Sequence, residues 1–284
     1  MIAPANWTEE ALNESEPITA AETAPFVTSF ARGLSVIRSF SDGHEAQSLS
    51  DIAKRTGMTR ATARRLIHTL ADLGYARADG RRFYLTARIL ELGYSYLSSA
   101  NLWTMVQPDM ETVVAQTGAS CSISVLDNDD IIYVARVSPQ QLMQRVINIG
   151  SRVPAHAVAM GRILLAQLGD DELWTRIQKM NLHPFTSRTI TDREKLFEAI
   201  KADRERGWSL IDREFDDGIS GIGMVIRDGN GKALAAANLS LSPEKVQQAE
   251  VLETLRTNLT DLTARIEDIA RNKASSTDTR PSGR

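Results

Sequence analysis

The strongest constraint on the fold of this chain is a pair of short helical patterns separated by a glycine, over residues 48–74. In the first pattern, Ser48 is suited to cap the start of a helix and Gly57 to end it. In the second, Thr59 precedes apolar residues that recur every three or four positions until Gly74. Two short helices joined by a glycine-containing turn are the signature of a helix-turn-helix, so we expect that motif here.

The outward face of the second helix is rich in arginine. Arg60, Arg64 and His68 are four residues apart in turn, and Thr62 and Arg65 flank them. In a helix-turn-helix that binds DNA, the N-terminal residues of the second helix meet base edges in the major groove. Arginine there bonds guanine, and threonine bonds a base or touches a thymine methyl. The alternative is an amphipathic helix with a basic, solvated face, and the helix alone does not decide between them.

A hairpin pattern follows directly, where apolar and polar residues alternate around Asp79-Gly80. A hairpin in this place is a wing, and Arg81 and Arg82 near its tip are suited to contact phosphates. We therefore predict a winged helix-turn-helix over residues 26–86. Its candidate contacts to double-stranded DNA are Ser48, Thr59, Arg60, Thr62, Arg64, Arg65 and Arg82.

The distribution of charge supports this interpretation. Residues 1–25 hold five acids and no base, and they lack a helical or strand period, so we expect a disordered acidic arm. Residues 26–100 hold 11 bases against six acids, whereas residues 101–270 hold 18 against 24. One basic segment in an otherwise acidic chain is typical of a nucleic-acid-binding domain, although a merely solvated basic surface has the same composition.

Composition also excludes several classes of protein. The single cysteine, Cys121, excludes an internal disulfide and a multi-cysteine zinc site. The longest apolar stretch, residues 155–168, contains His156 and Arg162 and is too short to span a membrane. The acidic N-terminus does not resemble a signal peptide. We therefore expect a cytoplasmic protein with no membrane contact, no metal site and no cofactor.

The rest of the chain predicts an α+β organisation. Residues 87–100 form a helical pattern with an apolar stripe, which we expect to link two domains and to pack against a second copy in a homodimer. Beyond it, we expect strands within 120–137, at 143–149, 208–211, 221–227 and 233–241, helices at 101–117, 155–168, 170–180, 192–206 and 243–271, and a disordered tail at 272–284.

Four sequence blocks together resemble the isocitrate-lyase-regulator (IclR) family, and the resemblance covers about residues 26–270. They are LSDIAKRTGMTRATARRLIHTLADLGY, LTARILELGYSYL, VPAHAVAMGRILLAQL and EFDDGISGIGMVIRDGNGKALAAANLSL. YVARV at 133–137 and IGSRVPAHAVAMGR at 149–162 are similar to the branch that regulates aromatic-acid catabolism. That branch handles protocatechuate, 4-hydroxybenzoate or β-ketoadipate. His156 departs from it, because a tyrosine is expected there, and this leaves the exact acid open.

The resemblance implies a GAF-like effector domain over residues 101–271, in which an antiparallel sheet is flanked by helices. It implies a transcription regulator that acts as a dimer, or as a dimer of dimers on DNA, and that represses or activates. It also implies an effector pocket, whose matching positions here are Ala159, Met160, Asp212, Ile219, Gly221, Asn238 and Ser240. The match at Asp212 can shift by one position to Ile211.

The chemistry of these positions suits a small carboxylic acid. The N-terminus of a helix at 155–168 favours an anion, and Asn238 and Ser240 are two residues apart and so share one face of a strand. The cations considered as partners of the acid are Arg136, Arg145 and Arg152. Solvent exposure of the polar pair and surface salt bridges for the arginines are the alternatives.

Three other functions stay open at this point. A regulator of another carboxylic-acid pathway, with a glyoxylate-like or acetate-like effector, has the same fold. Cys121 and His156 are the residue types of a cysteine-dependent enzyme, but Cys121 alternates with apolar residues as a buried cysteine does. A protein-interaction module is the third. The operator, the sign of regulation and the identity of the acid do not follow from the sequence.

Overall fold

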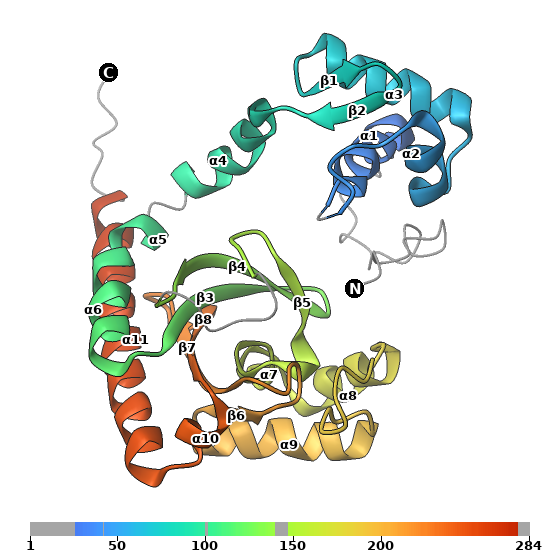
Figure 1. The fold of residues 1–284 in the computed structure, drawn as a ribbon. Helices are drawn as coiled ribbons and strands as arrows, with labels where there is room; N and C mark the ends of the chain where they lie inside the picture. Colours follow the sequence, from blue (N-terminus) through green and yellow to red (C-terminus); the bar gives the residue numbers. More distant parts are fainter. Residues whose placement is uncertain (1–25, 42, 100–101, 140–146, 278–284) are drawn as a thin grey trace. The chain divides into compact units, whose positions relative to one another are not determined.

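The chain folds into two compact units that divide between Ser99 and Ala100 (Figure 1). The structure, a computed structural model, describes residues 26–41, 43–99, 102–139 and 147–277. The acidic arm expected at 1–25 lies outside these residues.

The N-terminal unit is a small helical domain with a two-stranded wing. Its elements are α1 (Thr28–Ser39), α2 (Leu49–Thr56), α3 (Arg60–Asp72), β1 (Ala76–Asp79), β2 (Arg82–Leu85), the short 3-10 helix η1 (Ala87–Ile89) and α4 (Leu90–Ser99). Val36, Ile52, Ile67 and Phe83 bring α1, α2, α3 and the wing into one buried cluster. The predicted helix-turn-helix with a wing is therefore present.

The start of each helix in the motif depends on a polar side chain. Ser48 and Asp51 form a reciprocal capping box at α2, and Gly57 ends that helix in the left-handed conformation at φ 67°. The Thr59 hydroxyl accepts a hydrogen bond from the Thr62 backbone N–H at 3.2 Å and so caps α3. These caps fix the turn between the two helices.

The wing is hydrogen-bonded to the segment before α2. The backbone N–H of Gln47 donates to the carbonyl of Phe83 at 3.0 Å, and the N–H of Phe83 donates back at 2.8 Å. The Gln47 amide also donates to the Ser39 carbonyl at 2.9 Å, at the end of α1. Helix motif and wing are thus joined by backbone bonds as well as by the core.

Two helices of this unit carry apolar side chains on the surface. In and just before α1, Phe26 and Phe30 are each 69% exposed, and Leu34 continues the same stripe. At the start of α4, Leu90 is 71% and Tyr94 is 68% exposed. In α1 the core is instead contacted by Val36, which lies on another face of the helix.

The C-terminal unit is an antiparallel sheet with helices on both faces. Its strands lie in the order β5-β4-β3-β8-β7-β6. They are β3 (Ser120–Asp127), β4 (Asp130–Val137), β5 (Arg152–Pro154), β6 (Ser209–Asp212), β7 (Ser220–Arg227) and β8 (Ala233–Leu241). The helices are α5 (Leu102–Met105), α6 (Gln107–Thr117), η2 (Ala155–Ala157), α7 (Ala159–Leu165), α8 (Asp170–Lys179), α9 (Arg193–Arg206), α10 (Pro243–Val246) and α11 (Ala249–Thr277). The predicted α+β class, with an antiparallel sheet flanked by helices, is confirmed.

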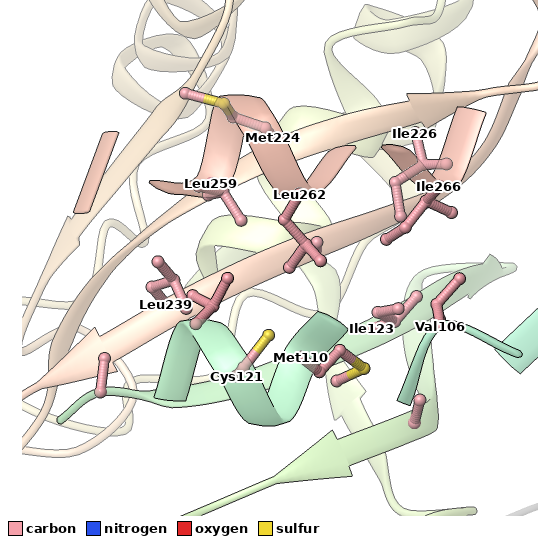
Figure 2. Packing of buried hydrophobic residues seen from close by; sticks show 14 of the residues in the cluster. Val106, Met110, Cys121, Ile123, Met224, Ile226, Leu239, Leu259, Leu262 and Ile266 are labelled. Carbon is pink, nitrogen blue, oxygen red and sulfur yellow. The ribbon is translucent and has the colours of Figure 1, made fainter. Parts of the chain in front are cut away.

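The two faces of the sheet differ in chemistry. One face is apolar, and Cys121, Ile123 and Leu239 pack there against α6 and α11 (Figure 2). The other face carries small and polar residues, which are Ser120, Ser122, Ser124, Gly221, Gly223, Asn238 and Ser240. Helix α7 packs on this second face.

The packing of α7 on the sheet is a contact between backbones. A Cβ at Gly223 would lie 2.8 Å from the carbonyl carbon of Ala159 and 3.0 Å from the Met160 nitrogen. A Cβ at Gly161 would lie 2.2 Å from the carbonyl oxygen of Ala155. Both positions therefore exclude a side chain, and the first turn of α7 lies directly on β7.

Four predicted elements differ in extent from the structure, and one of them is the helix expected at 101–117, which breaks at Val106 into α5 and α6. The helix expected at 155–168 begins only at Ala159, because Val158 is extended and lets Ala155 fold back onto Gly161. Of the strand expected at 143–149, residues 147–149 are not in a strand and residues 143–146 lie outside the described part of the chain. On the side of β4 away from β3, the pairing strand is β5.

The closing helix also differs from the prediction. It breaks after α10, and α11 continues to Thr277, so the first residues of the tail expected at 272–284 are helical. Residues 278–284 are not described. In the described ranges, every helix is too short or too polar to cross a membrane.

We predict that Gly223→Ala lowers the free energy of unfolding of the C-terminal unit by about 1–3 kcal/mol, because the new methyl group must displace the backbone of α7. Urea unfolding followed by tryptophan fluorescence measures this, since Trp103, Trp174 and Trp208 all lie in that unit. Gly169→Ala is the matched control, because no atom lies within 4 Å of its added Cβ. Equal effects of the two substitutions would contradict the backbone contact.

Candidate functional site

A cavity of about 50 Å³ lies where α7 begins above the polar face of the sheet. Its wall is completed by the connection between β6 and β7. The lining residues are Tyr133, Arg136, Ile147, Ala157, Val158, Ala159, Met160, Ile211, Phe215, Asp216, Ile219, Ser220, Gly221, Asn238 and Ser240.

A row of paired residues crosses the sheet beneath the cavity. Ser122 on β3 pairs with Arg136 on β4 at one side and with Asn238 on β8 at the other. Gly223 on β7 follows Asn238 in the same row. Arg136 donates a hydrogen bond to the Ser122 hydroxyl at 3.3 Å, so its guanidinium lies over the sheet and beside the cavity.

Arg136 reaches the cavity through an irregularity in β4. The pairing of β3 with β4 shifts between Ile123 and Ser124, and this shift leaves Val134 as an extra residue. Tyr133 and Arg136, three positions apart, therefore both line the cavity.

Burial shifts the pKa values of both Arg136 and Tyr133. Burial lowers the pKa of Arg136, but the ordinary pKa of a guanidinium is so high that the group stays charged. Burial also raises the pKa of Tyr133 to about 12. At neutral pH the cavity is therefore lined by a positive charge and a neutral phenol.

The connection between β6 and β7 is fixed by a buried ion pair. Arg162 on α7 and Glu214 are bonded side chain to side chain, with 4% and 10% of their side-chain surfaces exposed. Burial raises the pKa of Glu214, and the charge of Arg162 opposes this shift. Arg162 also donates to the His156 carbonyl at 2.9 Å, and Thr189 donates to the Glu214 carbonyl at 2.6 Å. These bonds position the segment that carries Phe215, Asp216 and Ile219.

Six of the seven predicted pocket residues line this cavity, namely Ala159, Met160, Ile219, Gly221, Asn238 and Ser240. Asp212 does not. Its carboxylate accepts a hydrogen bond from Ser220 at 2.6 Å and pairs with Arg188 at 2.5 Å. Successive side chains of a strand point to opposite sides, so Ile211 lines the cavity in its place.

The three arginines considered as partners of an acid differ in their position relative to the cavity. Arg136 lines the cavity. Arg152 instead pairs with Asp127 at 2.5 Å and with Asp130 at 3.2 Å. Arg145 lies outside the described residues. The helix that was expected to supply a positive N-terminus is only seven residues long, so Arg136 is the stronger source of positive charge.

Sequence reasoning missed Tyr133, Phe215 and Asp216. The alternation of serines at Ser120, Ser122 and Ser124 is the available signal, because it marks a strand face too polar for an ordinary core.

The predicted DNA contacts fall into two groups. Arg60, Arg64 and Arg65 are exposed on α3, and Arg82 is exposed on the wing strand β2. The side chains of Ser48 and Thr59 instead cap α2 and α3, and Thr62 contacts the Thr59 hydroxyl at 3.0 Å. His68 packs edge-on against Phe83, with ring centres 5.5 Å apart, and so supports the wing.

Cys121 and His156 are not brought together. Cys121 is fully buried on the apolar face of the sheet, and burial raises the pKa of its thiol to about 12. His156 lies in η2, on the face that α7 covers, and its ring nitrogen contacts the His183 carbonyl at 3.3 Å. A protonated thiol without a base beside it is not a nucleophile.

Two family models match the chain. The IclR helix-turn-helix domain matches residues 29–80, and the model described as bacterial transcriptional regulator IclR C-terminal matches residues 94–268. The chain is 38% identical to the Pca regulon regulatory protein of Pseudomonas putida, over 80% of its own length and 78% of the relative's. It is 34% identical to the p-hydroxybenzoate hydroxylase transcriptional activator of Acinetobacter baylyi, over 84% and 92% of the two lengths.

A solved transcriptional regulator from Rhodococcus sp. RHA1 is 42% identical, with a TM-score of 0.73 over 86% of this chain and all of that one. The predicted resemblance is confirmed, and so is the prediction of a regulator in place of an enzyme, because the named relatives are regulators. The chain belongs to the IclR family of bacterial DNA-binding transcription regulators.

Proposed function

We propose that this regulator binds its operator as a homodimer in the cytoplasm, and that a small organic acid of aromatic catabolism controls the binding. The names of two relatives refer to the Pca regulon and to p-hydroxybenzoate hydroxylase, which supports the aromatic pathway. The observation that supports an acid as the ligand is the position of Arg136, a half-buried cation at the wall of a largely apolar cavity.

The cavity suits the selective capture of an anion. A carboxylate that enters exchanges water for the guanidinium of Arg136, and the low polarity of the walls strengthens that attraction. Met160 and Phe215 supply flexible and aromatic contacts to the rest of a ligand. Because the cavity is about 50 Å³, a ring-sized acid enters only when side chains of the lining move, and Met160 is the most flexible apolar one among them.

The proposed contact with DNA follows from α3 and the wing. Arg60 and Arg64 are exposed near the N-terminus of α3, from which a recognition helix reads base edges. Arg82 on the wing is suited to a phosphate. A single recognition helix reads few base pairs, so two copies are needed for a specific site.

The exposed apolar stripes support the dimer. Phe26, Phe30 and Leu34 form one stripe, and Leu90 and Tyr94 lie on α4. Surfaces of this kind are rare on monomeric proteins and mark contacts with another protein. A second copy buries the same stripes on both partners at once.

The effector assignment predicts a thermal shift that depends on Arg136. A ligand at a hundredfold excess over its Kd stabilises the folded protein by about 2.7 kcal/mol, which raises Tm by several degrees. We expect at least one of a panel of benzoic acids to do so, and Arg136→Gln to weaken its binding by about 2–5 kcal/mol. Arg152→Gln is the control and keeps the shift. An acid that stabilises wild type and Arg136→Gln equally binds elsewhere, and glyoxylate as the better ligand would favour the other acid pathway.

The DNA assignment predicts different effects for α3 and the wing. Arg60→Ala and Arg64→Ala should each weaken operator binding by about 1–3 kcal/mol and relax sequence preference. Arg82→Ala should weaken operator and random DNA alike and lower the salt slope by about one. Fluorescence anisotropy over a salt series measures both. Equal losses on the two DNAs for Arg64→Ala would rule out its reading of bases.

The dimer assignment predicts that Phe30→Glu with Tyr94→Glu yields monomers in sedimentation velocity. The charges cannot be buried in the contact without a large desolvation penalty. Leu234→Glu is the control, because Leu234 is an exposed apolar residue of the other unit. The wild-type dimer should protect two half-sites about one helical turn apart, or a multiple of it. A wild-type monomer bound to a full operator would contradict this.

A further inference from the structure

Two aromatic rings meet at the surface of the C-terminal unit, in the seam between its outer helices. Helices α8 and α9 pack against each other, α9 also packs on α7, and Leu173 and Leu196 are fully buried in these contacts (Figure 1). The next residue of each helix is turned by about 100° around the helix axis. These residues, Trp174 and Phe197, are only half-buried, and their ring centres are 5.4 Å apart in an edge-to-face pair.

The two rings line an open cleft of about 330 Å³. Its other lining residues are Glu194 and Glu198, which are both exposed. They lie four residues apart on α9, so their side chains share one face of the helix. An aromatic pair that only closes the seam needs neither a cleft nor carboxylates around it. Aromatic rings combined with negative charge are instead suited to bind an organic cation.

A cation of the chain itself already contacts this cluster. The ammonium of Lys201, one helical turn after Phe197, lies 5.3 Å from the centre of the Phe197 ring and 3.4 Å from the Glu198 carboxylate. Lys201 does not line the cleft, however, and Glu194 has no ion pair among the described residues. The Glu194 carboxylate and the Trp174 ring are therefore available to a second cation.

The strength of these contacts indicates where that cation comes from. A cation over an exposed ring, or beside an exposed carboxylate, gains only a few-fold in affinity from each contact. Together, such contacts give a free small cation a Kd of about 1 mM or weaker. The same contacts are effective when the cation is one side chain of a larger interface, where tryptophan and arginine often dominate the binding energy. A protein is therefore favoured over a free amine.

The charge of the cleft restricts the partner further. Its two exposed carboxylates repel the phosphates of DNA. In a two-fold contact of this face with itself, the same carboxylates would face each other, which disfavours a second copy in that arrangement. Arginine suits the cleft better than lysine, because its planar guanidinium can stack on an aromatic ring and bond carboxylates through several N–H groups.

On these grounds, we propose that the cleft between α8 and α9 is a docking site for a different protein, which places an arginine side chain in it. The guanidinium stacks on Trp174, pairs with Glu194 and competes with Lys201 for Glu198. No residue lines both this cleft and the cavity at the start of α7. The regulator thus has a contact for a protein partner in addition to those proposed for DNA and for an acid.

The test uses fluorine NMR of the full-length protein labelled with 5-fluorotryptophan. The chain has four tryptophans, and Trp174→Phe identifies the signal of Trp174. A tetra-arginine peptide should shift this signal in a saturable way and bind more tightly than tetra-lysine. N-acetylarginine amide should bind much more weakly than the peptide, and tetra-glutamate should leave the signal unchanged.

A matched pair of double variants assigns the binding to the cleft. Glu194→Gln with Glu198→Gln should weaken tetra-arginine binding by about 10-fold, because both carboxylates of the cleft are removed. Glu172→Gln with Glu205→Gln is the control, since these glutamates are exposed on the same two helices and do not line the cleft. The control should change the affinity little. Circular dichroism verifies that each variant is folded.

A second pair tests the competition by the internal cation. Lys201→Gln should tighten tetra-arginine binding by about 2- to 5-fold, because it releases Glu198. Lys195→Gln removes the same charge from an exposed position of α9 and should have a smaller effect. Equal effects of the two lysine variants would contradict the competition at Glu198.

Three other outcomes would overturn the proposal. Absence of a saturable Trp174 shift, or equal losses in the two glutamate pairs, would mean that the cleft is not a binding site. Equal affinity for N-acetylarginine amide and tetra-arginine would assign the cleft to a free cation. A smaller assembly in sedimentation velocity for Glu194→Gln with Glu198→Gln would assign it to a second copy of this chain.

Discussion

The close contact between α7 and the sheet is the constraint on which the C-terminal unit depends. At Gly223 the backbone of one element lies against the backbone of the other, so the sheet face beneath α7 must be free of large side chains. That face consequently carries glycine, serine and asparagine, and three of its residues, Gly221, Asn238 and Ser240, line the cavity where α7 begins. The cavity and its chemistry follow from the same packing requirement.

The opposite face of the sheet is apolar and supplies most of the hydrophobic packing of its central strands. Cys121, Ile123 and Leu239 pack there with α6 and α11 in a large apolar cluster (Figure 2). Side chains of β3 and β8 thus alternate between this apolar face and the face that α7 covers, where Asn238 and Ser240 of β8 line the cavity. The buried pair Arg162 and Glu214 then fixes the remaining wall of the cavity from α7.

Local elements could be predicted from the sequence, whereas contacts between distant segments could not. The caps at Ser48 and Thr59 and the turn at Gly57 lie within a few residues of what they determine, so the helix-turn-helix was clear. The cavity was harder, because the extra residue Val134 in β4 brings Tyr133 and Arg136 to one site against simple alternation. The choice between Asp212 and Ile211 likewise required the pairing of β6 with β7.

Mutual backbone bonds between Gln47 and Phe83 join the segment before α2 to the wing strand β2. In the proposed contact with DNA, we therefore expect the helix motif and the wing to act as one unit. A unit of this kind presents its DNA-contacting residues in one arrangement, so we do not expect a signal from another domain to change which bases it contacts. In the proposed dimer, what an effector can change is the separation of the two DNA-binding units and the angle between them. Control of transcription then becomes a matter of half-site geometry, with the recognised bases unchanged.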